Sequence, residues 1–96
     1  MKTLPETFRK GGFNFTQLRR SDAVALFAKR KDDWLMDTYE VVIVQRHNGY
    51  KIGGKDIPPG EAMPSSATWG HLGWSYENRD DAEAKFEALV NTEAKP

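Results

Sequence analysis

Residues 57–76 constrain the fold most, because this stretch is twenty residues long and has the period of neither a helix nor a regular strand. Three prolines and three glycines interrupt it, yet it carries Trp69 and Trp74. Structureless stretches of this length are uncommon inside a compact domain and are usually functional or disordered. Disordered segments are poor in aromatic residues. We therefore predict an ordered loop that its indoles hold against the rest of the protein.

The length and composition of the chain favour a single domain over residues 1–96, with a core at about residues 8–90 and frayed termini. A chain of this size buries roughly two thirds of its unfolded surface. There is no cysteine, which excludes disulfides and thiolate zinc sites. The first residues lack the apolar run of a signal peptide, and no stretch is long enough to span a membrane. We expect a soluble, cytoplasmic protein.

Alternating apolar and polar residues from Phe13 predict a strand at residues 13–20. Residues 23–29 are predicted as its return strand, with Val24 and Leu26 on one face and Ala25 and Phe27 on the other. Ser21 and Asp22 lie between them and supply the short polar side chains that favour a turn, because such side chains bond to their own backbone. The two strands should therefore form a hairpin.

Residues 39–46 give the best strand of the chain. Residues 41–44 are apolar on both faces, which indicates a central strand that is covered on both sides. Asn48 and Gly49 follow it and form a strong hairpin signal, because both accept the positive φ of a type I′ turn. We expect residues 50–52 to return alongside this strand.

The last element should be a helix that begins after Asn78, a suitable N-cap residue. Asp80 and Asp81 fall in its first turn, where negative charge is favourable. Residues 91–96 should fray. The helix has one apolar stripe, formed by Ala82, Phe86, Leu89 and Val90.

These elements predict an α+β fold, with an antiparallel sheet of about four strands and the C-terminal helix on one face. One helix covers only one face of such a sheet. The long loop is the remaining apolar material, so we expect Trp69, Trp74 and Met63 to cover the other face. Partial coverage would leave an exposed apolar patch suited to a partner.

Catalytic and phosphate-binding motifs find no support in the sequence. Residues 49–55 fit the pattern GxxxxGK, but Asp56 stands where a phosphate-binding loop needs Ser or Thr. Pro58 and Pro59 then prevent the helix that such a loop requires. We interpret the match as coincidence.

The two histidines, His47 and His71, lack the carboxylates at helical spacing that metal sites show. His47 should be solvated beside its turn, and His71 should fill space in the loop. We predict no metal, no cofactor and no enzymatic activity. A weaker alternative is an enzyme whose small ligand sits in a loop-capped cleft around His71.

The charge of the chain is zero overall but divided. Residues 1–31 carry a formal charge of +6 and residues 32–96 carry −6. We expect the two halves to intermix in the fold and to cancel locally. The alternative is a nucleic-acid binder in which phenylalanines stack on bases beside basic side chains. Its basic residues would be Arg19, Arg20, Lys29, Arg30 and Lys31.

Protein binding is the leading hypothesis, because tryptophan and arginine are typical anchors of interfaces. Trp34 falls in a turn region and is the best candidate for an exposed apolar residue. The proposed contact residues are Trp34, Trp69, His71, Leu72 and Trp74.

Two stretches, Tyr39-Glu-Val-Val-Ile and residues 64–76 with residues 81–86 after them, resemble small proteins encoded by bacteriophages, mostly without an assigned activity. This resemblance implies an accessory protein in the cytoplasm of an infected bacterium. Such proteins often bind a host protein, including components of defence systems such as CRISPR effectors. The resemblance assigns no functional residues, and both the target and homo-oligomerisation stay open.

Overall fold

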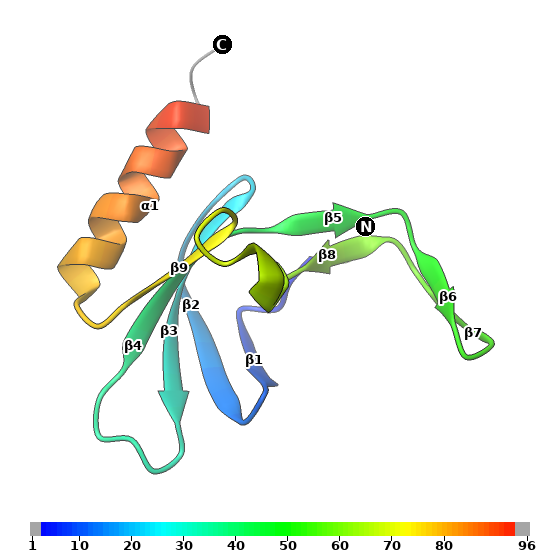
Figure 1. Cartoon of the computed structure of the whole chain (residues 1–96), viewed down its shortest axis with the longest axis horizontal. Coiled ribbons are helices and arrows are strands. Elements are labelled where there is room, and N and C mark those ends of the chain that lie inside the picture. The colour runs from blue at the N-terminus through cyan, green and yellow to red at the C-terminus, as the bar shows by residue number, and fades with distance from the viewer. Residues whose placement is uncertain (1–2, 94–96) are drawn as a thin grey trace.

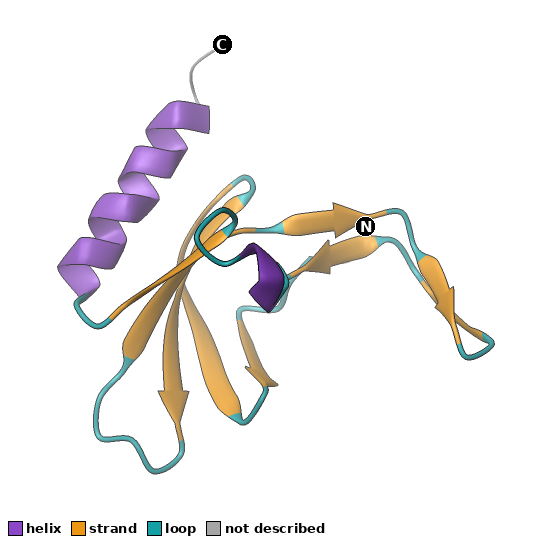
Figure 2. Ribbon diagram, in the orientation of Figure 1, coloured by secondary structure: helices purple, strands orange, loops and turns teal. Residues whose placement is uncertain are grey.

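The computed structural model describes residues 3–93 and contains a five-stranded antiparallel sheet with one α-helix packed on one face (Figures 1 and 2). The predicted α+β class is therefore confirmed, with five strands where about four were expected. Within the sheet the strands lie in the order β1-β2-β3-β4-β9. The elements are β1 (Thr7–Lys10), β2 (Phe13–Ser21), β3 (Val24–Lys31), β4 (Thr38–Ile43), β5 (Gln45–His47), β6 (Tyr50–Ile52), β7 (Lys55–Ile57), β8 (Gly60–Ala62), η1 (Ser66–Thr68), β9 (Gly73–Tyr76) and α1 (Arg79–Glu93).

The predicted hairpin is the pair β2 and β3, and it contains a bulge at Leu18. Gln17 pairs with Phe27, but Arg19 pairs with the next residue, Leu26, so Leu18 is the extra residue of β2. A bulge changes which face the following side chains point to. Arg19 therefore shares the helix-covered face with Leu26, and the side chain after it points to the opposite face.

Strand β4 is central, as predicted, because β3 and β9 flank it. Val41 belongs to the core under the helix, and Val42 belongs to the core on the opposite face. The strand expected at residues 39–46 is interrupted at Val44, whose N–H donates a hydrogen bond to the carbonyl of Ala23 at 2.6 Å. After this bond the chain leaves the sheet and enters β5.

Strands β5 to β8 form an arm that extends away from the sheet (Figure 1). The expected return at Asn48 and Gly49 is wrong: β6 pairs with β7, and the chain reverses at Gly53 and Gly54, which have φ of 54° and 77°. Two glycines suit a tight reversal as well as Asn-Gly does. Gly49 instead allows the backbone at Ile57 to approach closely, because a Cβ at position 49 would lie 2.8 Å from the carbonyl oxygen of Ile57.

Helix α1 begins as predicted, since Oδ1 of Asn78 accepts a hydrogen bond from the N–H of Asp80 at 2.7 Å. The expected apolar stripe packs on the sheet through Ala82 and Phe86. The helix continues to Glu93, and residues 94–96, the rest of the segment that was expected to fray, lie outside the described part. No helix within residues 3–93 is long and apolar enough to cross a membrane.

The sheet carries a core on each face. The core under the helix contains Val24, Leu26, Val41, Ala82 and Phe86. The opposite core contains Phe15, Ala25, Phe27, Val42 and Val44. Leu4, Phe8, Met63 and Trp69 pack on this second core.

The segment of residues 57–76 therefore covers the second face, as predicted, but it is not free of regular structure. It contributes β8, the short helix η1 and the edge strand β9. Strand β1 was not predicted, and it helps to cover the same face from the edge of the sheet opposite β9. Its Phe8 ring stacks on Phe15 with centroids 4.9 Å apart.

Candidate functional site

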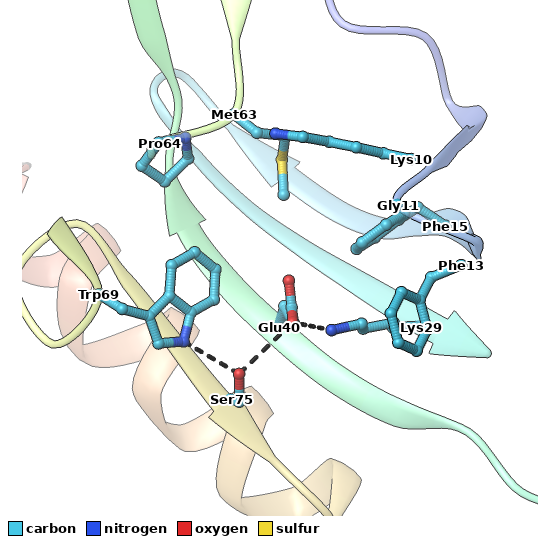
Figure 3. Close-up of a pocket in the computed structure, with 10 residues that line it drawn as sticks. All are labelled: Lys10, Gly11, Phe13, Phe15, Lys29, Glu40, Met63, Pro64, Trp69 and Ser75. Carbon is cyan, nitrogen blue, oxygen red and sulfur yellow. Dashed lines mark hydrogen bonds and ion pairs between the residues drawn. The ribbon is translucent and has the colours of Figure 1, made fainter. Parts of the chain in front are cut away.

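Trp69 is held on the second face of the sheet by the neighbouring edge strand β9. Its indole lies against the backbone of Gly73, where an added Cβ would overlap the ring. Its Nε1–H donates a hydrogen bond to Oγ of Ser75 at 3.0 Å. The short helix η1 and the turn after it bring the ring back over β9 (Figure 3). The indole is half-buried and has a fixed position.

A buried carboxylate lies beside this indole. Glu40 is 5% exposed, and its Oε2 accepts hydrogen bonds from Nζ of Lys29 at 2.9 Å and from Oγ of Ser75 at 3.4 Å. The second bond is long and therefore weak. Among the described residues, Oε1 receives no hydrogen bond, and it points into the open space above the sheet (Figure 3).

These residues form an open hollow of about 390 Å³, which we call the aromatic groove. Phe13 and Phe15 lie on one side of it, and Trp69 and Met63 lie on the other (Figure 3). The ion pair of Lys29 and Glu40 forms its floor. This volume falls in the range of ligand pockets, roughly 300–1,000 Å³.

The end of the groove at Phe13 is basic. Lys10, Phe13 and Lys31 are cross-strand neighbours on β1, β2 and β3, so their side chains share one face. Both lysines are exposed, and neither forms an ion pair within residues 3–93. Trp34 packs edge-on against Phe13, with ring centroids 5.3 Å apart.

Of the predicted contact residues, Trp69 lines the groove, and Trp34 packs on Phe13 on the opposite side without lining the groove itself. His71 is exposed and outside the groove lining, and Leu72 is half-buried with its carbonyl bound to the N–H of Ile43 at 2.8 Å. Because His71 borders no part of the groove, the groove does not provide the cleft around His71 that the enzyme alternative requires.

The prediction that Trp74 covers the face opposite the helix is wrong. Trp74 pairs with Val41 on the helix-covered face, and Nζ of Lys85 lies 4.1 Å from the centre of its ring. The reason is strand geometry. Successive residues of β9 point to opposite faces, so Ser75 faces the groove and Trp74 faces the helix.

The basic residues of the nucleic-acid alternative are mostly neutralised by carboxylates from the other half of the chain. This confirms the expected local cancellation of charge. Arg19 pairs with Glu83 and Glu87, Arg20 with Glu61, Lys29 with Glu40, and Arg30 with Asp37. Lys31 alone of the five forms no ion pair within the described range.

One of these partners, Glu61, joins three parts of the fold. Its side chain is 4% exposed and accepts hydrogen bonds from Arg20 at 2.7 Å and from the N–H of Leu4 at 3.1 Å. The hydrogen bond from Arg20 is the main cause that lowers the pKa of Glu61. This contact fixes the base of the arm beside the groove.

The described residues contain no cluster of three or more His, Cys, Asp or Glu side chains placed to hold a metal ion. Nδ1 of His47 accepts a hydrogen bond from the N–H of Gly49 at 3.2 Å, and its ring packs on Tyr50. The histidine therefore shapes the arm.

The floor of the groove and the most exposed apolar side chains were not predicted from the sequence. Glu40 could have been singled out from the sequence, because it is a charged residue in an otherwise apolar strand. Trp34 is half-buried, so the expectation that it is exposed is wrong; the residues after it, Leu35 and Met36, are 94% and 75% exposed. The order Trp34-Leu35-Met36 does not indicate which of these three side chains packs inward.

Comparison with known proteins gives no guide to this site, because no family model, no curated protein and no solved structure matches the chain. The geometry of the groove is therefore the basis for assigning a function.

Proposed function

We propose that this chain is a non-catalytic protein-binding module that contacts its partner through the aromatic groove. The observation that carries the proposal is an open hollow with Trp69 at one side and, at the other, Phe13, on which Trp34 packs. Interfaces concentrate their binding energy in a few aromatic and arginine side chains that fit pockets on the partner. A groove with aromatic walls supplies one half of such a contact.

The rigidity of the walls supports this proposal. Trp69 is fixed by Ser75 and by the backbone of Gly73, and Phe15 is fixed by stacking on Phe8. Association costs free energy when side chains become ordered on binding, by about 0.5–1.5 kcal/mol for each mobile side chain. Walls that are already ordered avoid most of this cost.

The exposed residues Leu35 and Met36 give the proposed interface a second apolar element. They follow Trp34 directly and line two hollows separate from the groove, one beside Trp34 and one beside Tyr39. A partner that occupies the groove and extends past Trp34 would cover both side chains.

The resemblance to phage-encoded proteins gives a narrower form of the same proposal. The partner would be a host protein in the bacterial cytoplasm, and binding would inhibit a defence system such as a CRISPR effector. Support for this narrower form comes from the resemblance alone.

Site-specific photocrosslinking tests the proposal. A photoreactive amino acid replaces Lys10, which lines the groove and is exposed, and a matched variant carries it at Ala88, which is exposed on the helix. Each variant is irradiated in bacterial lysate, and crosslinked proteins are identified by mass spectrometry. We expect one saturable partner from position 10 and none from position 88. Equal crosslinking at both positions, or none at either, would contradict the proposal.

A further inference from the structure

We infer that the aromatic groove accepts a tryptophan or tyrosine side chain carried on an acidic segment of the partner protein. This inference rests on the proposed function and specifies the chemistry of the partner. Three features of the groove lead to it: the position of Lys29, the free oxygen of Glu40, and the two unpaired lysines at the basic end.

Lys29 disfavours a cationic ligand against the rings of Phe13 and Phe15. Its Nζ lies 4.2 Å from the centre of the Phe13 ring and 5.9 Å from that of Phe15. Aromatic faces attract cations at this distance, and the protein's own lysine already occupies the position. An incoming lysine or arginine would meet this charge and that of Lys10 at the groove lining. The free space of the groove therefore suits an uncharged ring.

The floor of the groove favours a ring with one hydrogen-bond donor. Within residues 3–93, every fully buried side-chain nitrogen or oxygen has a hydrogen-bond partner, so the groove does not require a strongly polar ligand. One acceptor stays available, because Oε1 of Glu40 faces the groove without a hydrogen bond (Figure 3). Tryptophan and tyrosine each combine an apolar ring with a single donor that needs a partner when it is buried.

The basic end favours acidic residues beside that ring. Lys10 and Lys31 flank Phe13 on the groove face, and neither is neutralised by another described residue. An aspartate or glutamate near the inserted ring would pair with one of them. Such pairs are exposed and contribute modestly to affinity, but they set the register and select against basic partners.

The same two lysines argue for a protein rather than single-stranded nucleic acid. Affinity for a nucleic acid depends on the number of phosphates neutralised. Arg19, Arg20 and Arg30 already pair with carboxylates. Two free lysines at the groove would neutralise about two phosphates, which gives a weak and shallow electrostatic contribution.

The test uses a displayed library of random peptides, panned against the whole chain. We expect the recovered peptides to carry Trp or Tyr next to Asp or Glu. Replacing the aromatic residue of the best peptide by alanine should abolish binding. The double variant K10E/K31E should bind that peptide about tenfold more weakly, whereas K51E/K55E, with the same charge change on the arm, should bind it as the wild type does.

Several outcomes would overturn the inference. Recovered peptides that are basic, that lack an aromatic residue, or that bind K10E/K31E unchanged would show that the groove does not select this chemistry. Recovery of no peptide would overturn it as well, and tighter binding of an oligothymidine than of any peptide would assign the groove to nucleic acid. The proposed function fails separately, if position 10 crosslinks to no protein. If position 10 crosslinks to a protein whose binding needs neither an aromatic nor an acidic residue, only this inference is contradicted.

Discussion

Substitution of Gly73 by alanine tests the packing that forms the groove. The backbone of Gly73 does not adopt a positive φ, so alanine causes no strain there. The new methyl group would overlap the Trp69 ring. The ring must then move away from β9, which breaks the Nε1–Oγ hydrogen bond to Ser75 and exposes apolar surface.

The expected cost follows from these two losses. A net hydrogen bond contributes about 1 kcal/mol, and overpacking of a well-packed site costs typically 1–3 kcal/mol. We expect G73A to lower the free energy of unfolding by about 2 kcal/mol. In a W69A background the methyl group meets no ring, so the same substitution should be neutral or should stabilise by up to about 0.5 kcal/mol.

Urea unfolding followed by far-UV circular dichroism measures this double-mutant cycle without relying on tryptophan emission. The cycle compares the wild type with G73A, W69A and G73A/W69A. We expect a coupling free energy of about 2 kcal/mol. Independent sites add within about 0.5 kcal/mol, so a coupling below that value would refute the contact between Trp69 and Gly73 as the feature that orders this loop.

Three further results follow from the structure. E61Q should lower the free energy of unfolding by about 2 kcal/mol, because it leaves Arg20 without its buried partner. The pKa of Glu61 is lowered in the folded state, mainly by Arg20. The stabilisation by Glu61 is therefore complete above its ordinary pKa of 4.5 and is lost as the pH falls through the folded-state value. In urea unfolding at a series of pH values, the free energy of unfolding should fall less steeply with acid in E61Q than in the wild type, and an equal fall in both would contradict this. N78A should cost about 1 kcal/mol in the same assay, because it removes the cap of α1, and no change would argue against the cap. Fluorescence anisotropy with oligothymidine should detect no complex at physiological salt, with K10E/K31E as the control, because among the described basic residues at the groove only Lys10 and Lys31 are unpaired. A tight complex with a steep salt dependence would contradict this.

The sequence predicts those elements whose periodicity is strong. The β2–β3 hairpin, the central strand β4 and the capped helix follow from alternation, from the apolar run at residues 41–44 and from Asn78. Strand β1 was missed because Phe8 is its only apolar residue, and its pairing with β2 is decided by packing of Phe8 on Phe15.

The arm shows why local signals alone fail. Asn48-Gly49 and Gly53-Gly54 are equally suited to a reversal, and the choice between them depends on the pairing of β5 with β8 thirteen residues or more along the chain. Such pairing is a long-range property that turn chemistry does not contain. The interpretation of Trp74 failed for a related reason, because residues 73–76 were read as loop and the alternation of Trp74 with Ser75 was overlooked.

The candidate site was predicted only in part. The sequence indicates that aromatic residues of the loop cover the second face, and Trp69 does so. It does not indicate that Phe13 lies across the groove from this indole or that Glu40 lies on the groove floor, because these residues come together only when the sheet is assembled. The groove is therefore a property of the assembled fold.

The most direct test of the groove as the binding surface uses the indole N–H resonances of the three tryptophans in a nitrogen-15 NMR spectrum. Trp69 lines the groove, Trp34 packs on Phe13 of the groove lining, and Trp74 lies on the helix-covered face as an internal control. On addition of the crosslinked partner, or of the best peptide, we predict that the resonances of Trp69 and Trp34 shift and that the Trp74 resonance stays in place. A shift confined to Trp74, or no shift of Trp69 at saturation, would contradict the account.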